Sequence, residues 1–231
     1  MAERDPFRES RVESRRNRPA KPPLSRDAIV DEALRQISAE GGAEGGAPLS
    51  LRKIAKALDT GPASLYAYVD GMNELQALVL DHALGAVETA GDGFWRDRLE
   101  ALLLSYATVL ARSPALARMA FQTTAVGPHA LRINDALLGL LAEAGVDQAD
   151  AAWAIDLLSL FVTATVAEHA QDTGAAEPGG PIEQALARTS AGQYPRVHAA
   201  RDDILSGTGE ERFLWGIDIL VRGILARSQS R

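Results

Sequence analysis

The stretch LSLRKIAKALDTGPASLYAYV, residues 49–69, contains two short amphipathic segments separated by a turn. The first can form a helix capped by Ser50, and its apolar residues recur at intervals of three and four: Leu51, Ile54, Ala55 and Leu58. The second begins at Pro62, which suits the first turn of a helix, just after the turn at residues 59–61. Two helices joined so tightly predict a helix-turn-helix unit.

Helical spacing continues on both sides of this pair. A helix is predicted over residues 27–40, and a longer one from Met72 to about residue 90, where the glycines at 91 and 93 would break it. Apolar stripes then predict further helices as far as Ile224, including one at 148–172, and we find no strand-like alternation of useful length. The sequence therefore predicts an all-α fold.

Charge is distributed unevenly along the 231 residues. The net charge is −7, yet residues 1–70 hold 12 Lys and Arg against 11 Asp and Glu, so the acidic excess lies in the remainder. The first 26 residues alone hold eight basic and four acidic side chains, which predicts a disordered basic arm over residues 1–24. A solvated tail without function is the alternative reading of this arm.

Composition also indicates the cellular compartment of the protein. The chain has no cysteine for a disulfide or a thiolate metal site, and its first residues are charged rather than apolar, unlike a signal peptide. Its longest apolar run, at 157–167, is far short of the ~20 residues that span a bilayer. We expect a cytoplasmic protein with no membrane role and neither a cofactor nor a metal.

The segment from Pro62 to Val69 has an outward face whose residues are suited to contact a binding partner. Leu65 and Val69 lie four apart and would face the domain. The outward residues are small or carry hydroxyls: Pro62, Ala63, Ser64, Tyr66, Ala67 and Tyr68. Small residues allow close approach to base edges, and hydroxyls can reach phosphates. Packing of the two tyrosines against neighbouring helices explains the same pattern, so the pattern alone leaves both readings open.

The helix before that segment carries two cations, Arg52 and Lys53, in its first turn. This is the end of a helix at which the dipole disfavours cations, at a cost of roughly 0.3–1 kcal/mol each. A phosphate would compensate, because free N–H groups, the dipole and both side chains would point at one anion. The pair therefore indicates a contact with a phosphate.

The predicted helix at 148–172 is apolar around almost its whole circumference, so it must be covered on every side. The final helix is similarly apolar, and the two together predict half of a four-helix interface in a two-fold dimer. The residues that we expect in this interface are Trp153, Leu157, Leu160, Phe161, Trp215 and Ile219. The core of an ordinary monomer is the alternative.

The block from Ala28 to Leu78 resembles the N-terminal DNA-binding domain of the tetracycline-repressor (TetR) family. The match combines a first helix with LxxRKIAxxL, a short turn, SLYxxV and ELxxL in that order. A weaker similarity continues through HAQDTG at 169–174, QYPRVHAARDD at 193–203 and ERFLWGIDILVRGIL at 211–225. The resemblance implies a DNA-binding domain over residues 25–71 and an effector-binding and dimerisation domain over 72–231, of which 72–90 form a connecting helix.

The resemblance further implies a homodimer in which each subunit places its third helix in the major groove of an operator half-site. Arg52 and Lys53 match backbone-contacting positions of the family. The remaining DNA-contacting positions correspond to Gly61, Pro62, Ala63, Ser64, Tyr66 and Tyr68. The sequence departs from the family at Asp59, where a turn glycine is usual, and at Met72, where many members have a phosphate-binding lysine. The basic arm is a candidate source of the missing cations.

For the effector pocket, the resemblance points to the inner faces of helices between about 95 and 170. The pocket positions correspond to Leu102, Tyr106, Ala120, Thr123, Thr124 and Glu168. Ala120 stands where tetracycline repressors have the imidazole that holds the drug's magnesium, so we do not expect a magnesium–tetracycline effector. Glu168 matches a pocket position, although a solvated carboxylate at the helix end explains it as well. We expect a mainly apolar small molecule whose few polar groups meet Tyr106 and the threonines.

An enzyme is the main rival class, but the residues for catalysis are sparse. The four histidines, at 82, 129, 169 and 198, are scattered, and HExxH, GxSxG and GxxxxGK[ST] do not occur. We therefore expect no enzyme, but a ligand-responsive repressor that leaves a pseudo-palindromic operator when its effector binds. The alternative is a small-molecule-binding dimeric helical protein, or an enzyme, that does not bind DNA.

Overall fold

The computed structural model describes residues 23–39, 49–171 and 180–230, and in these ranges the chain forms helices and no strand. The prediction of an all-α fold is confirmed. The predicted basic arm over residues 1–24 lies outside the described residues except for its last two positions.

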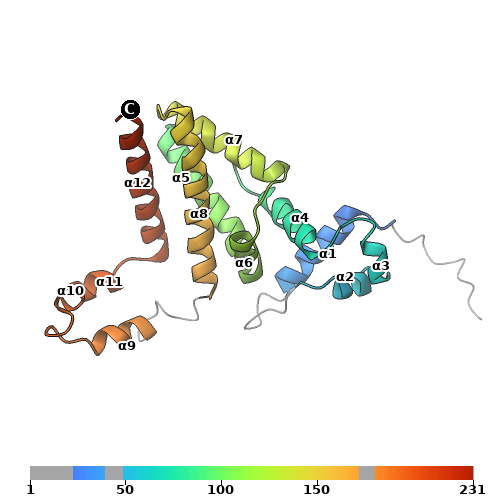
Figure 1. Ribbon diagram of the computed structural model, residues 1–231, viewed down its shortest axis with the longest axis horizontal. Coiled ribbons are helices and arrows are strands. Elements are labelled where there is room, and N and C mark those ends of the chain that lie inside the picture. Colours follow the sequence, from blue (N-terminus) through green and yellow to red (C-terminus); the bar gives the residue numbers. More distant parts are fainter. Residues whose placement is uncertain (1–22, 40–48, 172–179, 231) are drawn as a thin grey trace, which may run out of the picture.

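Four helices make up the N-terminal part. Helices α1 (Arg26–Ala39), α2 (Leu51–Ala57) and α3 (Pro62–Leu65) gather at one end of the molecule, and α4 (Met72–Leu84) packs against α1 (Figure 1). Ile29, Ile54 and Leu65 are fully buried among them. The turn between α2 and α3 contains Asp59 with φ +50°, a left-handed conformation that aspartate tolerates better than most residues. Asp59 thus takes the geometry for which a glycine would otherwise be used.

A larger bundle follows. It consists of α5 (Trp95–Ala111), α6 (Pro114–Gln122), α7 (Pro128–Glu143), α8 (Gln148–Gln171) and α12 (Gly209–Ser228). Helix α8 contacts each of the other four (Figure 1). By length and composition alone, α8 is also the one helix of the described ranges that could cross a membrane, over Gln148–Ala170, and 39% of an apolar 18-residue stretch within it is buried. Its place amid four helices is that of a core helix in a globular protein.

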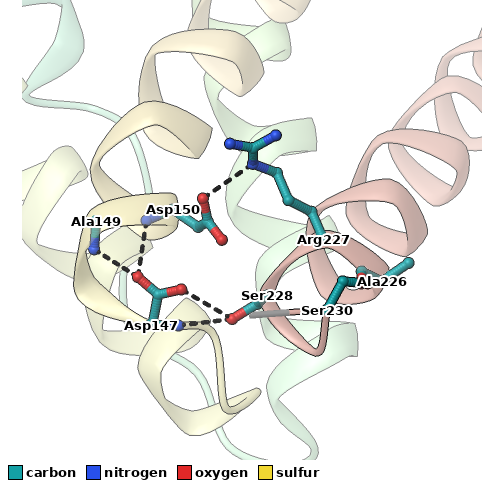
Figure 2. A network of polar contacts seen from close by, with 7 residues as sticks. All are labelled: Asp147, Ala149, Asp150, Ala226, Arg227, Ser228 and Ser230. Carbon is teal, nitrogen blue, oxygen red and sulfur yellow. Dashed lines mark hydrogen bonds and ion pairs between the residues drawn. The ribbon is translucent and has the colours of Figure 1, made fainter.

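A polar network joins the start of α8 to the end of α12 (Figure 2). The Asp147 carboxylate accepts hydrogen bonds from the N–H groups of Ala149 and Asp150, at 2.9 and 3.1 Å, and so caps α8. These backbone donors, that of Asp150 first, lower the pKa of Asp147. From α12, the Ser228 hydroxyl accepts from the Asp147 N–H at 3.0 Å, and Arg227 Nε donates to Asp150 at 3.1 Å. The network fixes the spacing of the two helices that carry the predicted dimer interface.

Three short helices connect α8 to α12: α9 (Pro181–Ala187), α10 (Pro195–Ala199) and α11 (Arg201–Leu205). In Figure 1 they extend beyond the lower ends of α8 and α12, away from α1–α3. Several of their apolar side chains are exposed, including Ile182 and Val197. This segment contributes little to the core of the subunit, in which α5–α8 and α12 take the main part.

Two helices are shorter than their sequence patterns predict. Helix α3 is one turn, Pro62–Leu65, and continues as a hydrogen-bonded turn through Tyr68. The connecting helix, expected to reach residue 90, ends at Leu84. Past Leu84 the chain continues in hydrogen-bonded turns, in which the Val87 N–H donates to the Leu84 carbonyl at 3.1 Å. Arg132 of α7 also donates to the carbonyl oxygens of Leu84, Gly85 and Val87, and so satisfies backbone groups at this helix end.

Candidate DNA-binding face and ligand cavity

The outward face of α2 and α3 is held in place by a small buried contact. Leu65 and Val69 are 0% and 1% exposed and lie in the same apolar core as Ile54 and Ala55 of α2. With these side chains inward, the predicted DNA-contacting residues Gly61, Pro62, Ala63 and Ser64 are all exposed. One turn of helix is thus presented to the outside on a rigid support.

The two tyrosines of this face differ. Tyr66 is 57% exposed, as expected of a residue that reaches a partner. Tyr68 is half-buried and packs against the core, as in the alternative reading of the pattern. Its carbonyl oxygen accepts a hydrogen bond from Arg26 Nε at 3.1 Å, and Arg26 also pairs with Glu74 of α4 at 3.5 Å. Arg26 therefore joins α1, the turn after α3 and α4.

Exposed cations lie along α2. Arg52 and Lys53 are exposed in its first turn, where there is no acidic residue. Lys56, one turn further on, is exposed as well, and the sequence reasoning passed over it although it lies three residues after Lys53. Met72, at the start of α4, is partly buried against the core. Basic character on this face therefore comes from α2 rather than from the start of α4.

A cavity of about 390 Å³ lies in the larger bundle, bounded by α4, α5, α6, α7 and α8 and by the segment between α6 and α7. Four of the six predicted effector residues line it: Tyr106, Ala120, Thr123 and Thr124. Further lining residues that the sequence reasoning missed include Leu80 and Leu84 of α4, Asn134 of α7, and Asp156, Ser159 and Thr163 of α8. On α8, these recur at helical intervals with Ala152 and Ile155, a stripe that could have been recognised in the sequence.

Two predicted pocket residues lie elsewhere. Leu102 is buried in the core at 2% exposure and does not line the cavity. Glu168 is exposed near the end of α8. Successive residues on a helix are separated by about 100°, so Glu168 points roughly 140° away from Thr163, the last lining residue of α8. This direction agrees with the reading of Glu168 as a solvated carboxylate.

Tyr106 is a deeply buried polar residue of the cavity wall, at 7% exposure. Burial raises its pKa from 10.0 to about 12, because the charged phenolate would lose its hydration. The phenol is therefore neutral at physiological pH and can donate or accept a hydrogen bond. Thr163 differs, because its hydroxyl already donates to the carbonyl oxygens of Ser159 and Leu160, at 3.0 and 3.1 Å, and can offer a ligand only a lone pair.

The predicted dimer residues form an apolar face on α8 and α12. Five of them are exposed in the single subunit: Trp153 at 76%, Leu157 at 43%, Leu160 at 53%, Trp215 at 69% and Ile219 at 48%. Phe161 is only partly exposed, and its ring stacks on Phe213 at 5.5 Å. A Cβ on Gly216 would lie 2.4 Å from the Phe161 ring, so this phenylalanine packs closely between α8 and α12 of its own subunit. Leu160 also borders the cavity, which brings the cavity close to the exposed face.

Comparison with known proteins gives one family. Residues 88–228 match a family model described as the tetracycline repressor-like C-terminal domain. The HTH-type transcriptional repressor DrrR1 of Streptomyces coeruleorubidus is 29% identical over 225 residues, which is 90% of this chain and 82% of that protein. The class A tetracycline repressor from transposon 1721 of Escherichia coli is 29% identical over 212 residues, 88% of this chain and 92% of that protein.

Solved structures agree with these sequence relatives. ActR of Streptomyces coelicolor in complex with (S)-DNPA has a TM-score of 0.80 at 32% identity, with 90% of this chain and 100% of that chain covered. The complex of ActR with actinorhodin has a TM-score of 0.78 at 31% identity, with 90% and 99% covered. The relatives are transcriptional regulators rather than enzymes, and ActR binds small molecules.

Proposed function

The chain belongs to the tetracycline-repressor family and is a ligand-responsive transcriptional repressor, and we propose that it acts as a cytoplasmic homodimer that leaves a pseudo-palindromic operator when a small molecule enters the cavity. The observation that carries this proposal concerns α4. This helix packs against α1 of the DNA-binding part, and its Leu80 and Leu84 are part of the cavity wall. A molecule in the cavity therefore touches the same helix that supports the DNA-binding face.

On the DNA side, we assign different tasks to the exposed residues. Arg52, Lys53 and Lys56 of α2 contact phosphates. These three cations make up for the phosphate contact that is missing because Met72 stands where many family members have a lysine. Gly61, Pro62, Ala63 and Ser64, with their small side chains, let the start of α3 approach base edges, and Tyr66 reaches a base or a phosphate. Tyr68, half-buried, contacts DNA with its outer edge while its ring supports α3.

The dimer uses the exposed apolar face of α8 and α12. Trp153 and Trp215 are the largest exposed side chains on it, and a contiguous face of this kind marks an interaction site. A second copy of the chain, related by a two-fold axis, covers it with the same residues. The network of Asp147, Asp150, Arg227 and Ser228 holds the two helices of each subunit in the spacing that this packing needs.

The cavity wall favours an amphipathic effector. Leu80, Leu84 and Ile133 supply apolar contacts, whereas Tyr106, Asn134 and Asp156 can bind polar substituents. Asp156 selects for a hydrogen-bond donor or a positive charge, because its carboxylate can only accept. This chemistry is more polar than the sequence reasoning assumed. Actinorhodin and (S)-DNPA, the ligands of ActR, are the first compounds to test.

A binding experiment tests the whole proposal. The purified protein selects duplexes from a random library, and the affinity for the selected sequence is then measured at several salt concentrations, with and without each compound. We expect a selected site with two-fold symmetry, affinity that falls with salt, and release by at least one amphipathic compound. Failure to enrich any sequence, or binding that salt does not weaken, would refute the repressor function for this chain.

A further inference from the structure

Helices α4 and α7 cap each other. Asp81 of α4 is 8% exposed, and its carboxylate accepts from the N–H of Ala130 at 3.0 Å and from that of His129 at 3.4 Å, both in the first turn of α7. In the opposite direction, Arg132 Nη2 of α7 donates to the carbonyl oxygens of Gly85 and Val87, at 3.2 and 3.1 Å, just past the end of α4. Each helix thus satisfies terminal backbone groups of the other.

Gly127 makes room for this arrangement. A Cβ added at Gly127 would lie 2.1 Å from Cγ of Asp81, closer than two such atoms can approach. The backbone of Gly127 has φ −81°, which any residue can adopt, so the need for glycine here is purely steric. The Asp81 carboxylate occupies the space that the missing side chain leaves above the start of α7. We call Asp81, Gly127 and Arg132 the α4–α7 clasp.

The clasp adjoins the cavity wall, and its helix α4 contacts α1 of the DNA-binding part. On α4, Leu80 and Leu84 line the cavity next to Asp81. Thr123 and Thr124, which lead into Gly127, line it as well. Beyond the clasp, α4 packs against α1. One connected set of residues therefore leads from the cavity wall, through the clasp, to the helix that carries the DNA-binding part.

We propose that the α4–α7 clasp is the element that transmits occupancy of the cavity to the DNA-binding part, with Asp81 and Arg132 as positioning residues. Helices in apolar contact alone can slide past each other, but hydrogen bonds to charged side chains are short-ranged and directional. A ligand that displaces the segment before Gly127 moves the start of α7, and α4 must either follow or lose these bonds. The proposal rests on the proposed function, because it concerns the regulation of the same cavity and the same DNA-binding face.

Coupling between two sites is reciprocal, so the clasp can be tested from the DNA side without knowing the effector. Amide hydrogen exchange over residues 123–133 is measured for the full chain, with and without the selected operator duplex. These residues include the His129 and Ala130 amides that donate to Asp81. In the wild type, we expect operator binding to change the exchange rate of this segment on the order of tenfold, within the usual range of coupling between sites.

Two variants and a control separate coupling from simple stability. Gly127→Ala forces Asp81 away and should reduce the DNA-induced change in exchange to less than about twofold, while the variant still binds the duplex. Asp81→Asn keeps the volume and one acceptor, and should give an intermediate change even if Gly127→Ala does not fold. Gly139→Ala, in the middle of α7 with nothing within 4 Å of the added Cβ, should behave as the wild type. A general loss of stability would alter exchange with and without DNA alike, but would not remove the difference between them.

The outcomes distinguish this proposal from the one on which it rests. If the wild type binds operator but its 123–133 amides do not respond, or if Gly127→Ala and Asp81→Asn respond as Gly139→Ala does, the clasp is not the coupling element. If the wild type binds no duplex at all, the proposed function fails and the clasp proposal fails with it.

Discussion

Replacement of Trp153 by alanine should dissociate the proposed dimer, because this side chain is the most exposed large apolar residue on the α8–α12 face. A tryptophan side chain offers roughly 200 Å² for burial, so at 76% exposure about 150 Å² remains for a partner to cover. At about 25 cal/mol per Å² of buried apolar surface, burial of this area stabilises the proposed dimer by about 4 kcal/mol per subunit. An alanine side chain in its place would retain roughly a fifth of this free energy. Because a two-fold dimer contains the residue twice, the expected loss is about 6 kcal/mol as an upper bound, or roughly 10⁴ in the dissociation constant.

Sedimentation velocity over a range of protein concentrations measures this dissociation constant directly. Leu131→Ala is the matched control, because Leu131 is 61% exposed but lies on α7, outside the α8–α12 face. Both variants should keep the wild-type helix content, since neither side chain is buried. An increase of less than about tenfold for Trp153→Ala, or an equal increase for Leu131→Ala, would refute the assignment of the dimer interface.

Three other predictions concern the remaining parts of the molecule. Arg52→Ala should weaken binding to all duplexes and lower the slope of log affinity against log salt by about 1, whereas Arg188→Ala, an exposed arginine on the α9 segment, should change neither quantity. The folded protein keeps the Tyr106 proton up to about pH 12, whereas the unfolded chain releases it near pH 10. The stability due to the neutral phenol is therefore complete below pH 10 and falls by about 2–3 kcal/mol as the pH rises to 12. Denaturant unfolding across this range should show the fall in the wild type and a smaller one in Tyr106→Phe; equal falls would contradict the assigned burial. Arg227→Ala should lower the free energy of unfolding by about 1–2 kcal/mol, since it leaves Asp150, at 5% exposure, without this partner. Arg222→Ala should lower it by less than about 1 kcal/mol, because the pair of Arg222 with Asp218 at 2.8 Å is solvated. Urea denaturation compares the two, and equal costs would show that burial of Asp150 does not decide the strength of its pair.

The DNA-binding helices could be predicted from the sequence because their signals are local. The intervals of three and four in α2, the proline that begins α3 and the pair Leu65 and Val69 each depend on residues within a few turns of one another. The cap of α8 at Asp147 is local in the same sense, because the carboxylate bonds N–H groups two and three residues further on. The left-handed turn at Asp59 is also compatible with the sequence, because aspartate is one of the few residue types that accept this conformation. Such features follow from backbone geometry before any helix meets another.

The cavity could be predicted only in part. Tyr106, Ala120, Thr123 and Thr124 were found through the resemblance to a family, and the structure places all four on one cavity wall. Leu80 and Leu84 were missed, because nothing in the spacing of α4 shows that two of its leucines border a cavity in another part of the chain. Leu102 and Glu168 lie elsewhere because a small difference in helix rotation decides which residues face a cavity.

Sequence alone thus determined the helical fold, the helix-turn-helix pair and the apolar character of α8 and α12, since these depend on periodicity and on residue type. The tertiary structure decided which group satisfies the carbonyl oxygens just past the end of α4, because Gly85 and Val87 accept from an arginine more than forty residues away. It also turned Phe161 inward against Phe213 while Trp153 stayed exposed, although both belong to one apolar helix. These outcomes depend on which side chains meet when distant segments pack, and the spacing of residues along a chain does not contain that information.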